Sequence, residues 1–275
     1  MNGLRTLTVV ADLHGLGGVT GALLFLAAVL AGAMNAVAGG GSFISFPALT
    51  FTGVLPIPAN ATSTVALWPG AVASLGAYWK KLPRRARLVA AMTLTSMVGG
   101  LLGAVLLVHT SQSTFMRLVP YLFLGATLLF TFGKRLHEWA RTLTHGAGRA
   151  PRDLSSWTII AAAVPVQLAI SVYGGFFGGG IGILMLAFLS VIGMEDINAM
   201  NAIKSLLQAA INAAAVVTFI AARIVVWPQA LLMLVGAVVG AYGGARVAQR
   251  LDPRLVRGFV IAVGFSMTFY FLWKR

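Results

Sequence analysis

The sequence predicts an all-α polytopic membrane protein made of two inverted-topology repeats, each with about five hydrophobic segments and with glycine-rich helix breaks or re-entrant hairpins. Three observations predict this fold class: high hydropathy, an internal repeat and an uneven placement of basic residues. Of the 275 residues, 59% are hydrophobic and 9% are charged, and the mean hydropathy is +0.90. A soluble domain carries roughly 25% charged residues. A soluble protein with buried helices is therefore disfavoured, because too few polar residues remain to cover its surface.

Apolar segments follow one another along the whole chain, and each is predicted to be helical because lipid cannot satisfy free backbone groups. They are about 17–35, 42–53, 60–79, 88–108, 115–133, 157–177, 181–193, 198–222, 228–245 and 255–273. Segments 42–53 and 181–193 are too short to cross a bilayer alone. Each of them either crosses together with its predecessor as a thin pair or forms a re-entrant hairpin with it.

The second half of the chain repeats the plan of the first. Three consecutive glycines precede each short segment, at Gly39–Gly41 and at Gly178–Gly180. Other matched positions are Gly99 and Gly103 with Gly236 and Gly240, and Arg117-Leu118-Val119 with Arg254-Leu255-Val256. We therefore predict a first transmembrane repeat over 17–133, a cytoplasmic linker over 134–156 and a second transmembrane repeat over 157–273.

The basic residues predict the orientation of both repeats. Most of the 20 Lys and Arg residues lie in three connectors, namely 80–87, 134–156 and the stretch that holds Arg246, Arg250, Arg254 and Arg257. Cytoplasmic loops of membrane proteins have this composition, so the net charge of +14 does not indicate nucleic-acid binding. The basic connector precedes the fourth segment of the first half and follows the fourth segment of the second, which predicts opposite insertion. We expect a multi-pass protein of the bacterial inner membrane with both termini outside.

The triple glycines are candidate substrate-binding turns. Glycine lets the backbone approach a ligand and permits positive φ, and the helix that follows begins with unpaired N–H groups that attract an anion. In the first half the candidate residues are Asn35, Gly39, Gly40, Gly41, Ser42 and Ser45, and in the second half they are Gly178, Gly179 and Gly180. Tight helix packing by small residues is the competing interpretation.

Polar residues form a stripe on the segment that follows each short one. Spacings of three and four place them on one helical face. The first stripe holds Asn60, Ser63 and Thr64, and the second holds Asn198, Asn201, Lys204, Ser205, Gln208 and Asn212. A polar stripe in lipid must face the protein interior or water, which makes these residues binding candidates. Hydrogen bonds that only hold the bundle together are the alternative.

Lys204 is the only charged residue well inside a predicted span. An ammonium there costs several kcal/mol unless it is paired or hydrated. Two interpretations are open: contact with an anionic ligand, or an ion pair with Glu195 or Asp196 about two turns upstream.

The sequence predicts no enzyme, cofactor or metal site. It has no cysteine, and no predicted span carries a pair of His or Asp residues or a Ser–His set that could catalyse hydrolysis. A carboxylate proton relay also has no mid-span residue.

The sequence resembles the TauE/SafE sulfite exporter family, also called the toluene sulfonate uptake permease family. The resemblance rests on 32-GAMNAVAGGGSFISFPALTFTGVLPIPANATSTVALWPG-70 and on the weaker copy 178-GGGIGILMLAFLSVIGMEDINAMNAIKSLL-207. The second copy departs from the pattern because Leu186 stands where Pro47 stands in the first. The resemblance implies a transporter of sulfur-containing or other organic anions, such as sulfite, sulfonates or sulfoacetate.

These features together predict an inner-membrane carrier for a small anion, with export as the expected direction. A channel of the same architecture and a non-transporting membrane subunit are the alternatives. The expected partners are the anionic substrate and membrane lipid, without nucleic acid, and the oligomeric state is open.

Overall fold

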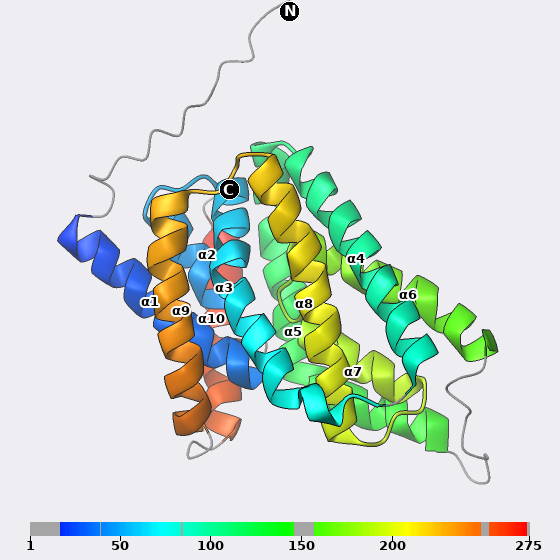
Figure 1. Ribbon diagram of the computed structural model, residues 1–275. Coiled ribbons are helices and arrows are strands. Elements are labelled where there is room, and N and C mark those ends of the chain that lie inside the picture. Colours follow the sequence, from blue (N-terminus) through cyan, green and yellow to red (C-terminus); the bar gives the residue numbers. More distant parts are fainter. Residues whose placement is uncertain (1–16, 39, 84, 146–156, 249–252, 274–275) are drawn as a thin grey trace, which may run out of the picture.

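The computed structural model describes residues 17–38, 40–83, 85–145, 157–248 and 253–273, and all regular structure within these ranges is helical (Figure 1). The helices in chain order are α1 (Gly18–Ala38), α2 (Ser42–Phe51), α3 (Pro56–Tyr78), the short 3-10 helix η2 (Trp79–Lys81), α4 (Ala86–Val108), α5 (Gln112–His145), α6 (Trp157–Phe176), α7 (Ile181–Val191), α8 (Ile197–Ala221), α9 (Trp227–Ala248) and α10 (Pro253–Trp273). Each predicted apolar segment corresponds to one α-helix. The all-helical prediction is therefore confirmed for the described ranges.

Several helix ends differ from the prediction for simple physical reasons. Helix α3 begins at Pro56 and α10 at Pro253, because the fixed φ of proline suits the first helical position and its missing N–H is not needed there. Helix α5 continues to His145, twelve residues past the apolar segment, because helical hydrogen bonds do not require apolar side chains. The predicted linker 134–156 therefore starts as helix, and its residues 146–156 lie outside the described part.

Five of the described helices, α1, α4, α5, α6 and α8, are long and apolar enough to cross a membrane. Helix α3 has 23 residues but does not belong to this group. Its polar residues, which include Asn60, Thr62 and Ser63, lower its hydropathy.

The first helix of each half packs against the fourth helix of the other half, so that α1 lies on α9 and α6 lies on α4. Glycine allows both contacts. A Cβ added to Gly103 of α4 would overlap the carbonyl oxygen of Val172, and one added to Gly240 of α9 would overlap the carbonyl oxygen of Val29. Small residues let membrane helices approach this closely, and close packing is what holds them together in lipid.

Helices α3 and α8 lie side by side between these two pairs and run in opposite directions (Figure 1). Helix α3 ends at the lower end of the view, where η2 follows, whereas α8 begins there and ends at the upper end. The end of α5, the end of α9 and the start of α10 also lie at the lower end. The described residues beside all three basic connectors are therefore on one side of the molecule.

The short helices α2 and α7 end in the same way. In α2 the Val54 amide donates to the Leu49 carbonyl at 3.1 Å across Gly53, which has a φ of +89°. The corresponding bond closes α7 at 3.0 Å across Gly193, which has a φ of +101°. This is the Schellman arrangement, and its left-handed position favours glycine.

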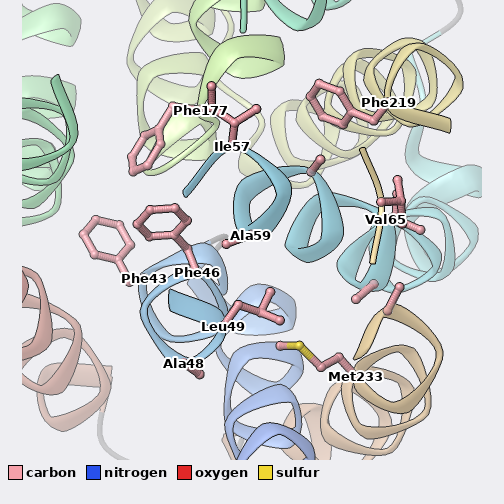
Figure 2. Packing of buried hydrophobic residues seen from close by; sticks show 14 of the residues in the cluster. Phe43, Phe46, Ala48, Leu49, Ile57, Ala59, Val65, Phe177, Phe219 and Met233 are labelled. Carbon is pink, nitrogen blue, oxygen red and sulfur yellow. The ribbon is translucent and has the colours of Figure 1, made fainter. Parts of the chain in front are cut away.

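Aromatic side chains fill the interior around α2 (Figure 2). The ring of Phe46 is fully buried, and its centroid lies 5.9 Å from those of Phe123 and Phe271 and 6.3 Å from that of Phe177. Figure 2 shows Phe43, Phe46 and Phe177 gathered on one side of α2. This face of α2 packs against apolar side chains, whereas Ser45 of the same helix contacts Ser63 of α3.

Candidate functional site

The packing of α3 on α8 brings the helices of the two predicted polar stripes together. The indole Nε1 of Trp68 on α3 donates to the Ala209 carbonyl of α8 at 3.3 Å. Asn60 and Ser63 are buried, whereas Asn201, Lys204, Gln208 and Asn212 are half-buried. Asn60 and Ser63 of the first stripe are therefore closed off in this structure, whereas Thr64 and much of the second stripe keep part of their surface accessible.

The donors of the first half are already engaged with protein groups. The hydroxyl oxygens of Ser45 and Ser63 lie 2.6 Å apart, and the Ser45 hydroxyl donates to the Gly41 carbonyl at 3.2 Å. The side-chain amide of Asn60 donates to the Phe176 carbonyl at 3.1 Å, while Thr64 donates to the Asn60 carbonyl at 2.9 Å. These contacts agree with the alternative that the first stripe holds helices together. The bond from Asn60 to Phe176 also ties α3 to the segment just before the second triple glycine.

In the first triple glycine, Gly41 is a packing element. Gly41 has a φ of −55°, which any residue can adopt, but a Cβ there would lie 2.5 Å from the Ala31 carbonyl oxygen. Close packing rather than positive φ therefore explains Gly41. Gly40 is buried, and Gly39 lies outside the described residues.

The second triple glycine has a different conformation. Gly178 and Gly180 have φ values of +78° and +72°, which are left-handed positions that favour glycine. The phenol of Tyr173 donates to the Gly179 carbonyl at 2.6 Å across this turn. Gly180 is the N-cap residue of α7, and no side chain caps the first turn of that helix. The Ile181 amide donates to the Gly178 carbonyl at 3.5 Å and the Ile183 amide to the Gly180 carbonyl at 3.1 Å, so backbone carbonyls of the turn, and no side chain, engage these first amides of α7.

Lys204 belongs to α8, and its side chain reaches the start of α7. A Cβ built on Gly182 would lie 3.5 Å from Cδ of Lys204, so the aliphatic stem of the lysine crosses the first turn of α7. The side chain of Asp196 caps α8 by accepting the Asn198 amide at 2.9 Å. Contact of Lys204 with an anionic ligand and an ion pair of Lys204 with Glu195 or Asp196 both stay predictions.

The other candidates of the second stripe lie on α8 as predicted. Ser205 is buried and Gln208 is half-buried, whereas the side-chain amide of Asn201 donates to the Ile197 carbonyl of its own helix at 2.9 Å. Asn35 and Ser42 are half-buried on α1 and α2. In the described part of the chain, no hydrogen bond joins any of these side chains to Lys204.

A second buried polar cluster lies where α4 meets α6, and the sequence did not single it out. The side-chain amide of Gln167 donates to Ser96 at 2.8 Å and to Ser171 at 3.1 Å, while its carbonyl oxygen is buried without a partner. All three side chains have no exposed surface. The sequence did carry one sign of this cluster, because Gln167 is a polar residue inside an apolar span. It was missed because the search for polar residues followed only the two stripes.

An apolar groove of about 600 Å³ opens on the outside of α4, α5 and α6. Its lining residues are Leu106, Leu118, Pro165, Leu168, Ala169, Val172, Tyr173 and Phe176. Because almost all of this lining is hydrocarbon, the groove suits lipid and offers nothing to bind an anion. Within the described residues, no group of three or more His, Asp and Glu side chains could hold a metal ion.

Comparisons with known proteins point to one family. The family described as Sulfite exporter TauE/SafE matches residues 24–271. A probable membrane transporter protein of Haemophilus influenzae is 27% identical over 248 residues, which cover 90% of this chain and 92% of that protein. The probable membrane transporter protein YfcA of Escherichia coli is 29% identical over 250 residues, which cover 90% of this chain and 87% of that protein. No solved structure matches.

Proposed function

We propose that this chain, which belongs to the TauE/SafE sulfite exporter family, carries a small oxyanion or sulfonate across the bacterial inner membrane. The observation that carries this proposal is the placement of Lys204 over the uncapped first turn of α7. The family membership supports membrane transport, and its relatives carry names that specify no substrate.

Two positive features at this place favour an anion. The start of a helix carries a partial charge of about +0.5. The side chain of Lys204 brings a basic group to the same turn, and the side chain of Asp196 accepts the Asn198 amide as the N-cap of α8. An ammonium inside a membrane is costly unless it is paired or hydrated. A bound oxyanion would neutralise both features, and Ser205, Gln208 and Asn201 on the same face of α8 would supply further donors.

We also propose that the two halves form an inverted repeat, with the site near their meeting point. Three features support this: the reciprocal packing of α1 on α9 and of α6 on α4, the opposite directions of α3 and α8, and the matching ends of α2 and α7 at Gly53 and Gly193. Inverted repeats of transporters place substrate near the bilayer midplane, at broken helices. The side with the basic connectors would be cytoplasmic, as the positive-inside rule requires.

Export is the direction that the membrane voltage favours. An interior that is negative by 100 mV drives each negative charge outward with about 2.3 kcal/mol. An exporter of anions therefore needs no coupled ion. Uptake would need one, and the described residues show no acidic cluster to hold it.

A binding screen on purified protein tests the proposal. The probes are sulfite, sulfate, sulfoacetate, taurine and acetate, and each is titrated onto wild type, Lys204→Met and the matched control Lys81→Met at equal folded protein. We expect at least one probe to bind wild type and Lys81→Met, because Lys81 is an exposed residue of η2. Lys204→Met should lose at least about tenfold in affinity, which corresponds to 1.4 kcal/mol. Equal affinity in all three proteins would remove Lys204 from the site.

One observation favours a second candidate function. Asn60, Ser45 and Ser63 all bond to other protein groups, as expected for a membrane subunit that does not transport. Absence of binding for every probe to folded wild type would support that candidate.

A further inference from the structure

We infer that Tyr173 is a positioning residue of the proposed anion site, because its hydroxyl holds the second triple-glycine turn in the conformation that sets the start of α7 against Lys204. This inference rests on the proposed function. It adds a residue that lies outside both polar stripes and outside both glycine turns.

Tyr173 contacts the turn through both its main chain and its side chain. Its carbonyl accepts the amides of Phe177 at 2.9 Å and Gly178 at 3.1 Å, which closes the end of α6. Its phenol then reaches over the turn and donates to the Gly179 carbonyl at 2.6 Å. The ring itself lines the apolar groove and packs edge-on against Phe177, with the centroids 6.4 Å apart. The ring is thus fixed by apolar packing, and its one polar atom is directed at the turn.

The turn needs such a contact because its own residues do not define its shape. Gly178 and Gly180 both occupy left-handed positions, and glycine visits many other conformations at little cost. The first triple glycine differs: Gly41 has ordinary helical angles and is wedged against the backbone of Ala31. At the position of the first half that corresponds to Tyr173, 139 residues earlier, the chain has Met34, which cannot donate a hydrogen bond. Only the second turn therefore relies on a phenol.

The second triple-glycine turn lies only a few residues from the point where α7 contacts the side chain of Lys204. Gly179 precedes Gly180, the N-cap of α7, and Gly182, two residues further, lies beneath the lysine stem. A displacement of the Gly179 carbonyl therefore moves the N–H groups of the first turn of α7 relative to the ammonium. Binding sites lose affinity when their donors are misplaced by about 1 Å.

A double-mutant cycle in anion binding tests the inference. Tyr173→Phe removes only the hydroxyl and keeps the ring, and Tyr242→Phe, a change on the exposed part of α9, is the matched control. Affinities for sulfite and sulfoacetate are measured on wild type, Tyr173→Phe, Tyr242→Phe, Lys204→Met and the double variant Tyr173→Phe with Lys204→Met, all corrected for the folded fraction. One lost hydrogen bond corresponds to roughly a three- to tenfold change.

We expect Tyr173→Phe to bind each probe about three- to tenfold more weakly than wild type and Tyr242→Phe to bind as wild type does. In the Lys204→Met background, Tyr173→Phe should add little further loss, because both residues act on the same anion. A role in folding alone would lower the folded fraction and leave the affinity of the folded protein unchanged, which would overturn the inference. If Lys204→Met loses binding but Tyr173→Phe does not, this inference fails and the proposed function stands. If Lys204→Met binds as tightly as wild type, Lys204 does not belong to the site and this inference fails. If wild type binds none of the five probes of the screen, the proposed function fails and this inference fails with it.

Discussion

The charge on Lys204 is the feature that the proposed site depends on, and the shape of the charged group should matter as well. Arginine keeps the positive charge but replaces a compact ammonium with a planar guanidinium. Its bulk has to fit over the first turn of α7, where a Cβ added to Gly182 would be in ordinary van der Waals contact with the lysine stem. We expect Lys204→Arg to bind anions more weakly than wild type but clearly more tightly than Lys204→Met, which loses at least about tenfold. Isothermal titration on matched folded protein measures both, and equal loss in the two variants would mean that charge alone does not explain the role of Lys204.

The sequence predicted which residues of the site lie on which helix, but it did not predict their contacts. The spacing of polar residues placed Asn60, Ser63 and Lys204 on the correct helices and identified Lys204 as exceptional. It could not show that Ser63 bonds to Ser45, because that contact depends on how α2 folds back on α3. It also missed the Tyr173 hydroxyl, because the phenol meets the Gly179 carbonyl only through a left-handed turn.

Among the helices, close packing at glycine should account for much of the stability. A Cβ at Gly103 would overlap the Val172 carbonyl oxygen, whereas a Cβ at Gly125 of α5 meets nothing within 4 Å. We expect Gly103→Ala to destabilise the protein by about 1 to 3 kcal/mol through overpacking. Gly125→Ala should be neutral or stabilising by up to about 1 kcal/mol, because alanine favours helix. Thermal unfolding in detergent compares the two variants, and similar midpoints would show that α4 and α6 do not need close contact.

The helices themselves could be predicted from hydropathy more accurately than their breaks. Apolar segments reproduce the order of the α-helices, since lipid leaves no alternative to internal hydrogen bonding. The two triple glycines look alike in the sequence and were treated as equivalent turns. In the structure, Gly41 is required by packing and Gly178 and Gly180 by positive φ. The two triple glycines differ in structure because their neighbours differ: Ala31 packs against the first, and Tyr173 bonds to the second.

For the whole molecule, the inverted-repeat proposal makes a prediction about sidedness. The connector with Ser111 lies at the upper end of Figure 1, and the connector that contains Ser155 follows α5, which ends at the lower end. The chain has no cysteine, so single cysteines at these two positions can be labelled without removing others. We expect an impermeant thiol reagent to label Ser111→Cys from outside intact cells and Ser155→Cys only after the membrane is opened. Labelling of both from the same side would contradict the proposed topology.

Flux through purified protein in liposomes tests the central claim most directly. Vesicles are loaded with sulfite, a potassium gradient with valinomycin sets the interior negative, and efflux is followed for wild type, Lys81→Met and Lys204→Met at equal reconstituted protein. The account predicts saturable, voltage-driven efflux for wild type and Lys81→Met and at least a tenfold lower rate for Lys204→Met. Efflux that is the same in all three proteins, or no faster than from protein-free vesicles, would contradict an anion carrier built around Lys204.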